Sequence, residues 1–97
     1  MTEDEIYTEA LELFGREAQL RQTQEEAAEL IVAINHYLRG NPSGFSEILE
    51  EITHVKIMIG QLEVVIGKSY AKEVIGEAME RELLRLENRI KEYKHDA

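Results

Sequence analysis

Two clusters of side chains in this sequence could hold a divalent metal ion. The first contains Glu25, Glu26 and Glu29, and the second contains Glu51 and His54. Residues three apart are neighbours on the surface of an α-helix, so Glu26 and Glu29 can point at one place, and so can the second pair. Three carboxylates that meet repel one another unless a cation neutralises them. Carboxylate oxygens favour Mg²⁺, which keeps several waters and commonly binds substrate phosphates as well.

These clusters form one site only if two helices pack side by side. Apolar residues of the segment 17–39 form one stripe at helical spacing, namely Leu20, Ala27, Leu30, Ile31, Ile34 and Leu38. A second stripe in the segment 45–66 spans a sector of about 80° and contains Ile48, Ile52, Val55, Ile59, Leu62 and Ile66. The loop 40–44 between them is short and contains Gly40 and Pro42. We therefore expect an antiparallel pair with the stripes face to face and both clusters in one groove.

Two further helices complete the predicted fold. Thr2 and Glu5 have the spacing of a capping box, which predicts a first helix near the N-terminus, and Gly15 should break or kink it. Ser69 is expected to cap a last helix that reaches about Tyr93. No segment alternates in the manner of a β-strand. The predicted fold class is all-α, with four helices.

The apolar content predicts self-association. Leu49, Ile57 and Val64 lie outside the stripe of the third helix, and a helix that is apolar on more than one face is usually buried on more than one face. The last helix carries a 4-3 spaced seam typical of helix packing, made of Met79, Leu83, Leu86, Ile90 and Tyr93. A chain of 97 residues builds only a modest core by itself. We expect a homodimer or a homotetramer.

Composition excludes several classes of function. The 20 acidic and 11 basic residues give a net charge of −9, which disfavours nucleic acid as a partner. The chain contains no cysteine, so thiolate zinc sites and cysteine nucleophiles are excluded. No signal peptide and no apolar run long enough for a membrane helix are recognisable. We expect a single cytoplasmic domain over residues 1–97, without a membrane or nucleic-acid partner.

Residues 24–31 (QEEAAELI) and 50–55 (EEITHV) resemble the MazG-like all-α nucleoside triphosphate pyrophosphohydrolases. The signature of that family is E-E-x-x-E, a spacer, then E-x-x-D. The resemblance runs from about Phe14 to Gly67 and is greatest to the short, single-domain, phage-type members. It implies a MazG-like four-helix bundle completed by oligomerisation. It also implies Mg²⁺-dependent cleavage of a nucleoside triphosphate to the monophosphate and pyrophosphate.

The same resemblance implies roles for individual residues. Glu26, Glu29 and Glu51 would be metal ligands, and Glu25 would orient or activate the attacking water. His54 stands where the family has Asp, and its imidazole nitrogen suits Mn²⁺, Co²⁺, Ni²⁺ or Zn²⁺ better than Mg²⁺. Three alternatives stay open: an active site with a changed metal preference such as Mn²⁺, a site that binds nucleotide without hydrolysis, or an inactive helical module for protein interaction.

Other polar and aromatic residues are expected to have structural roles. His36 should be a surface histidine on the polar side of the second helix. Tyr37, Phe45 and Tyr70 lie at expected helix ends, where aromatic side chains usually pack against neighbours.

Overall fold

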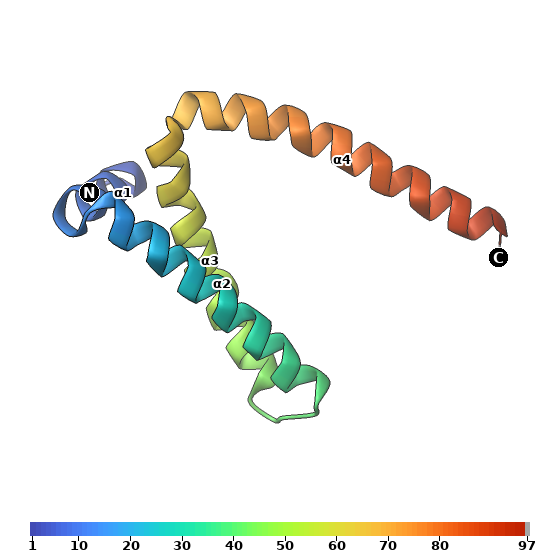
Figure 1. Ribbon diagram of the computed structural model, residues 1–97. Helices are drawn as coiled ribbons and strands as arrows, with labels where there is room; N and C mark the ends of the chain where they lie inside the picture. Colours follow the sequence, from blue (N-terminus) through green and yellow to red (C-terminus); the bar gives the residue numbers. More distant parts are fainter. Residues whose placement is uncertain (97) are drawn as a thin grey trace. The chain divides into compact units, whose positions relative to one another are not determined.

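The structure, a computed structural model, describes residues 1–96, and all of its regular secondary structure is helical (Figure 1). Its elements are α1 (Glu3–Phe14), α2 (Arg16–Leu38), α3 (Gly44–Ile66) and α4 (Lys68–Asp96). The prediction of four helices without a strand is therefore confirmed for the described residues. None of these helices combines the length and the apolar character needed to span a bilayer. The chain divides into two units, Met1–Val65 and a second that begins at Ile66, and each is described by itself.

The first helices begin and end where the local signals predict. The hydroxyl of Thr2 accepts a hydrogen bond from the backbone N–H of Glu5 at 3.1 Å, as expected for an N-cap. Gly15 separates α1 from α2 with a φ of 93°, a left-handed conformation that costs glycine little. Gly40 follows the end of α2 with a φ of 80°. The predictions at these three positions are confirmed.

The start of α4 differs from the prediction. The helix begins at Lys68, because the carbonyl of Gly67 already accepts a hydrogen bond from the N–H of Ala71 at 2.8 Å. Ser69 therefore lies inside the first turn, and its expected role as the cap is wrong. The helix also continues past Tyr93 to Asp96, since no glycine or proline follows to interrupt it.

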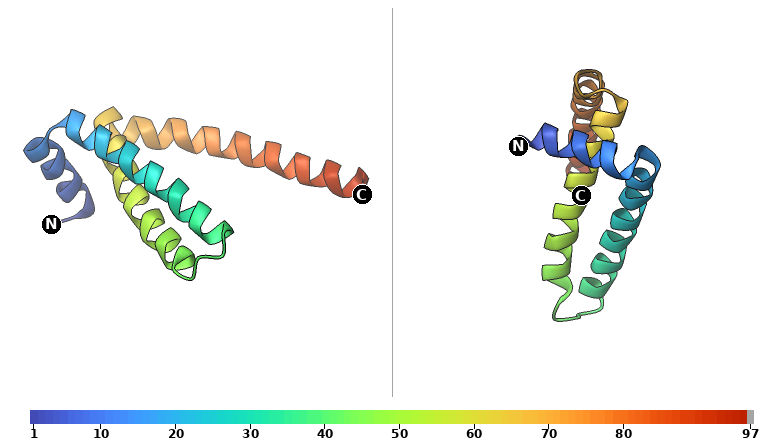
Figure 2. Two further views of the ribbon diagram at one scale, coloured as in Figure 1. Left: turned by 60° about the horizontal axis from the view of Figure 1, so that its bottom comes forward. Right: turned by 90° about the vertical axis from the view of Figure 1, so that its left-hand side faces the viewer.

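Helices α2 and α3 run antiparallel, side by side, on either side of a short loop (Figures 1 and 2). Within the loop, the N–H of Gly44 donates to the carbonyl of Asn41 at 3.0 Å. Gly44 is buried, and a Cβ atom there would lie 2.6 Å from the backbone of Tyr37. Only glycine lets α3 begin this close to the end of α2. The nearby rings of Tyr37 and Phe45 have centroids 6.5 Å apart, but both side chains are exposed, so the expected packing role stays a prediction.

The contact between α2 and α3 combines polar and apolar side chains. The amide Nε2 of Gln19 donates to Oε1 of Gln61 at 2.7 Å, and Gln61 is only 5% exposed. The small side chain of Ala33 and the flexible one of Met58 fill buried positions on the two helices. Gln19 and Glu26 lie two turns apart on α2, and both contact α3. Polar contacts therefore join the two helices alongside the buried apolar residues.

The apolar stripes are covered only in part, contrary to the expectation that they face each other. The half-buried members of the stripes are Leu30, Ile48, Val55 and Leu62. The exposed members are Leu20, Ala27, Ile31, Ile34, Leu38, Ile52, Ile59 and Ile66. The physical reason is that each helix of a two-helix pair covers only the part of its neighbour that it touches, so much of each stripe stays open to water. Leu49 and Ile57 on the far side of α3 are also exposed. A homodimer or homotetramer would cover this surface and stays a prediction.

Helix α1 packs through one aromatic ring. Tyr7 is 8% exposed, and its hydroxyl donates to Oε1 of Glu3 at 2.9 Å. The ring lies directly over Gly60 of α3, where an added Cβ would come within 2.8 Å of the Tyr7 Cζ atom. Gly60 thus makes room for α1.

Replacing Gly60 with alanine should destabilise the fold by about 1–3 kcal/mol, because the new methyl group overlaps the Tyr7 ring. A loss of stability would point to the overlap with Tyr7, since alanine is otherwise favoured over glycine inside a helix by about 1 kcal/mol. Urea unfolding followed by circular dichroism measures the change. In a Tyr7→Ala background the same substitution should be neutral or stabilising; a loss of equal size in both backgrounds would show that the ring is not the cause.

Candidate metal centre

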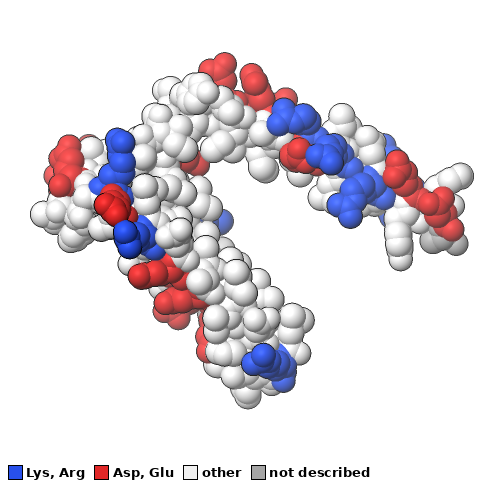
Figure 3. All heavy atoms as spheres, in the orientation of Figure 1, with Lys and Arg blue, Asp and Glu red and all other residues white. Residues whose placement is uncertain are grey.

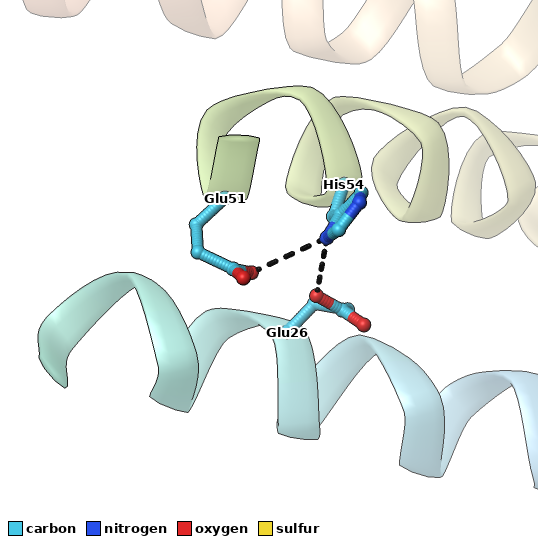
Figure 4. A group of neighbouring side chains, drawn as sticks. All are labelled: Glu26, Glu51 and His54. Carbon is cyan, nitrogen blue, oxygen red and sulfur yellow. Dashed lines mark hydrogen bonds and ion pairs between the residues drawn. The ribbon is translucent and has the colours of Figure 1, made fainter. Parts of the chain in front are cut away.

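Three of the predicted ligands converge between α2 and α3. Glu26 projects from α2, while Glu51 and His54 project from successive turns of α3 (Figure 4). The Nδ1 atom of His54 lies 3.1 Å from Oε2 of Glu26 and 3.5 Å from Oε2 of Glu51. One nitrogen and two carboxylate oxygens of these residues lie within 4.8 Å of one another. The antiparallel pairing of the helices thus brings together groups that are 28 residues apart in the chain.

The two carboxylates are mostly hidden from water. The side chain of Glu26 is 14% exposed and that of Glu51 is 13% exposed, whereas that of His54 is 41% exposed. The Oε2 atom of Glu51 is buried and accepts no hydrogen bond, and its contact with His54 is an ion pair at 3.5 Å. A buried carboxylate oxygen without a hydrogen bond is costly unless a proton or a cation satisfies it.

The surroundings of Glu51 favour its protonated form. Burial raises the pKa of Glu51 to about 7, and hydrogen bonding to Glu26 and the negative charge of Glu29 act in the same direction. Near neutral pH, this carboxyl group is therefore divided between its neutral and charged forms.

The pKa shifts of Glu26 and His54 favour the charged form of each group. Burial raises the pKa of Glu26, but hydrogen bonds with Glu51 and Gln22 and the charge of His54 outweigh it, so the net pKa is lowered. Burial lowers the pKa of His54, but the charges of Glu26 and Glu51 outweigh it, so the net pKa is raised. A protonated His54 therefore neutralises part of the acidic charge.

The donor set fits a divalent cation. Two carboxylates and one imidazole nitrogen already face a common point, and the Glu51 oxygen that lacks a hydrogen bond is one of the donors. A metal ion would displace protons from Glu51 and His54, because metal ligands must be deprotonated. The imidazole donor suits Mn²⁺ and later transition metals, and carboxylates suit Mg²⁺ and Mn²⁺. The donors alone do not identify the ion.

The other two predicted site residues lie outside this group of three. Glu29 is exposed, but its charge and its hydrogen bond with Glu51 both contribute to the raised pKa of Glu51. Glu29 and Glu51 also line the same groove, which has a volume of about 270 Å³. Glu25 is exposed on α2. Sequence reasoning placed all four proposed ligands at one point, whereas the structure brings together Glu26, Glu51 and His54 and leaves Glu29 at the edge.

The groove extends to a second pair that sequence reasoning missed. Nδ1 of His36 lies 2.7 Å from Oε2 of Glu47, and the hydroxyl of Ser43 donates to Oε1 of Glu47 at 3.0 Å. Hydrogen bonds with His36 and Ser43 lower the pKa of Glu47. His36 is therefore a half-exposed residue paired with α3, where a plain surface histidine was expected. The sequence contained a signal for this pair, because His36 and Glu47 lie at similar distances from the short loop, and such residues face each other in an antiparallel helix pair.

Acidic side chains gather midway along the α2–α3 pair on the face displayed in Figure 3. This distribution agrees with the excess of acidic residues in the sequence. A concentrated negative field raises the local concentration of cations and opposes the approach of bare anions. A phosphate ligand would therefore need an accompanying metal ion.

Comparisons with known proteins add no assignment. The chain matches no protein-family model, no curated protein and no solved structure. The candidate metal centre therefore depends on the residue pattern and the geometry described above.

The pKa of Glu51 predicts a specific dependence of stability on pH when metal is removed with a chelator. Between pH 4.5 and about 7, the folded state holds a proton on Glu51 that the unfolded state has released. The contribution of Glu51 to stability therefore falls as the pH rises through this window. Glu51→Gln should melt at a higher temperature than the wild type at pH 8, and the difference should shrink towards pH 5.

Glu50→Gln is the matched control, because it removes an exposed carboxylate from the adjacent position of α3. Differential scanning calorimetry at several pH values gives both comparisons. If Glu50→Gln and Glu51→Gln shift the melting temperature by the same amount at each pH, the buried setting of Glu51 has no energetic consequence and the prediction is wrong.

Proposed function

We propose that this chain is a metal-dependent nucleoside triphosphate pyrophosphohydrolase, which converts a (deoxy)nucleoside triphosphate and water to the monophosphate and pyrophosphate. The observation that carries the proposal is the convergence of Glu26, Glu51 and His54, with one buried carboxylate oxygen that lacks a hydrogen bond. The MazG-like pattern of residues 24–31 and 50–55 suggests the reaction type.

Each acidic residue then has a distinct role. Glu26 and Glu51, with His54, would hold the ion, and Glu29 would add a carboxylate from the groove. A bound divalent ion neutralises the charge that develops on the phosphate oxygens. Glu25 would accept a proton from the attacking water. The water oxygen forms a bond to the α-phosphorus, the bond from the α-phosphorus to the bridging oxygen breaks, and pyrophosphate leaves.

The groove supports a nucleotide site that a second copy completes. Its volume of about 270 Å³ is slightly below the roughly 300–1,000 Å³ typical of small-molecule pockets. Val32 and Ala33 give it an apolar side next to the carboxylates of Glu29 and Glu51. Exposed apolar residues on the same two helices, among them Ile31 and Ile52, would be covered in a homodimer or homotetramer. In such an assembly the second copy would close the groove over the base or the sugar.

The rival function is a helical protein-interaction module whose site is catalytically impaired, with or without bound nucleotide. The observation that favours it is the position of His54, whose protonated ring can neutralise Glu26 and Glu51 in place of a metal. The exposed apolar residues on every helix are equally compatible with binding another protein. Enzyme assays separate the two functions.

Release of pyrophosphate from a panel of ribo- and deoxyribonucleoside triphosphates, with Mg²⁺ and Mn²⁺ tested separately, is the direct test. We expect metal-dependent release from at least one triphosphate. Glu26→Gln should lower kcat/KM by about 100-fold or more, since it removes charge stabilisation at the reacting phosphates. Glu77→Gln is the control. Glu77 and Glu80 on α4 have the same Glu-x-x-Glu spacing as Glu26 and Glu29, so removing the exposed carboxylate of Glu77 should leave the rate unchanged. No release with either metal would favour the interaction module.

His54→Asp should shift the metal preference of the reaction towards Mg²⁺. The substitution replaces a nitrogen donor with a carboxylate and removes the imidazolium that competes with the metal. The ratio of kcat/KM with Mg²⁺ to kcat/KM with Mn²⁺ should rise by about tenfold or more relative to the wild type. An unchanged ratio would place His54 outside the metal coordination.

A further inference from the structure

Helix α4 carries an apolar seam that the described residues leave uncovered. The helix has 29 residues, which corresponds to a length of about 43 Å. Every residue from Met79 to Asp96 is exposed. The seam consists of Met79 (53% exposed), Leu83 (56%), Leu86 (48%), Ile90 (47%) and Tyr93 (78%). Large apolar side chains in a regular row gain free energy when a partner removes them from water.

The width and charge of α4 indicate what kind of partner fits. The five side chains lie within a sector of about 80°, the narrow seam of a two-stranded coiled coil, whereas membrane-surface helices combine a strong apolar face with an excess of basic residues. Helix α4 contains seven basic and seven acidic residues. The net charge of −9 therefore resides in the rest of the chain. Two copies of this helix can approach each other without net repulsion.

We propose that α4 pairs with α4 of a second copy of this chain as an antiparallel two-stranded coiled coil, centred between Leu83 and Leu86. The proposal concerns only the second unit of the chain and does not depend on the proposed enzymatic function. It specifies both the direction and the register of the helices.

The register follows from how the seam residues fill layers. Around the proposed centre, Leu83 faces Leu86 of the second copy, and Met79 faces Ile90. The next layer places Gly76 opposite Tyr93, the largest and most exposed member of the seam. A Cβ atom at Gly76 would meet nothing within 4 Å, so there is open space for the ring. This pairing would also explain why Gly76 lies inside a helix, where glycine is otherwise unfavourable.

Flanking charges favour the antiparallel direction. In the proposed register, Glu82 lies beside Arg89 of the second copy, and Glu73 lies beside Lys94. Both contacts occur twice because of the two-fold symmetry. The unfavourable contact between Glu80 and Glu87 also occurs twice, but Lys91 lies 2.8 Å from Glu87 on the same helix and weakens it.

The parallel arrangement would bring like charges together. An in-register parallel pair with the same seam places Glu82 beside Glu87 of the second copy and Arg89 beside Lys94. Each of these repulsive contacts would also occur twice, and the opposite charges of Lys68 and Glu73 near the start of the helix would compensate for only half of them. The sequence of α4 therefore discriminates between the two directions.

The absence of cysteine from the chain makes the proposal directly testable. Full-length Met79→Cys and Ile90→Cys proteins are mixed, unfolded, refolded together and oxidised. Antiparallel pairing places the two new cysteines in one layer, whereas two copies of the Met79→Cys thiol would be roughly 16 Å apart along the axis. A disulfide needs Cα atoms within about 7 Å. Arg81→Cys mixed with Asn88→Cys is the matched control, since these positions have the same axial level on the outer face.

We expect the mixed 79/90 disulfide to form at least about tenfold faster than either the control pair or the homodisulfides of the single variants. Preferential homodisulfides at positions 79 and 90 would establish parallel pairing and overturn the proposal. If no pair forms faster than the control, the seam is covered by another protein or by residues of the first unit, and the proposal is also wrong.

Charge reversal gives an independent readout in the same background. Glu82→Arg should slow formation of the mixed disulfide, because it places a second positive charge beside Arg89 of the second copy. Adding Arg89→Glu should restore the rate, since the opposite charges then face each other again. In a parallel pair, Glu82→Arg alone would instead relieve the repulsion from Glu87 and promote pairing, so faster association of this variant contradicts the proposal.

Discussion

Glu26 and Glu51 bring two carboxylates together between α2 and α3, and the pairing of these helices depends on what neutralises them. A proton on Glu51 removes one of the negative charges, and a protonated His54 adds a positive charge 3.1 Å from Glu26. A divalent cation bound at the candidate metal centre would replace both the proton and the imidazolium. Because these forms of neutralisation compete, metal binding, protonation and helix packing are thermodynamically linked. Because this site lies in the contact between two helices, a change in its protonation also changes the stability of the fold.

Much of the arrangement could be predicted because it depends on local signals. Thr2, Gly15 and Gly40 have side-chain or backbone properties that favour a helix end, and each acts as expected. A short loop leaves two long helices little choice but antiparallel contact. Residues at similar distances from the loop then face each other, and this brings Glu26 to His54.

The rotation of each helix about its own axis could not be predicted. Helix α3 is apolar on more than one face, so the pattern does not decide which side meets α2. Close fit restricts this rotation: Gly44 allows α3 to approach the end of α2, and Gly60 of α3 receives the Tyr7 ring of α1. Buried hydrogen bonding through Gln61 adds a polar constraint that hydrophobic periodicity does not reveal. This rotation leaves Glu29 at the edge of the centre.

The short loop between α2 and α3 has a kinetic consequence. Contacts across this pair join residues 28 to 42 positions apart, such as Glu26 with His54 and Gln19 with Gln61. Helical proteins dominated by contacts of modest sequence separation fold quickly, because little chain entropy is lost before contacts form. Synthesis proceeds from the N-terminus, so the helices that carry the candidate metal centre emerge before α4. The centre can therefore assemble on the nascent chain, ahead of any step that requires two finished copies.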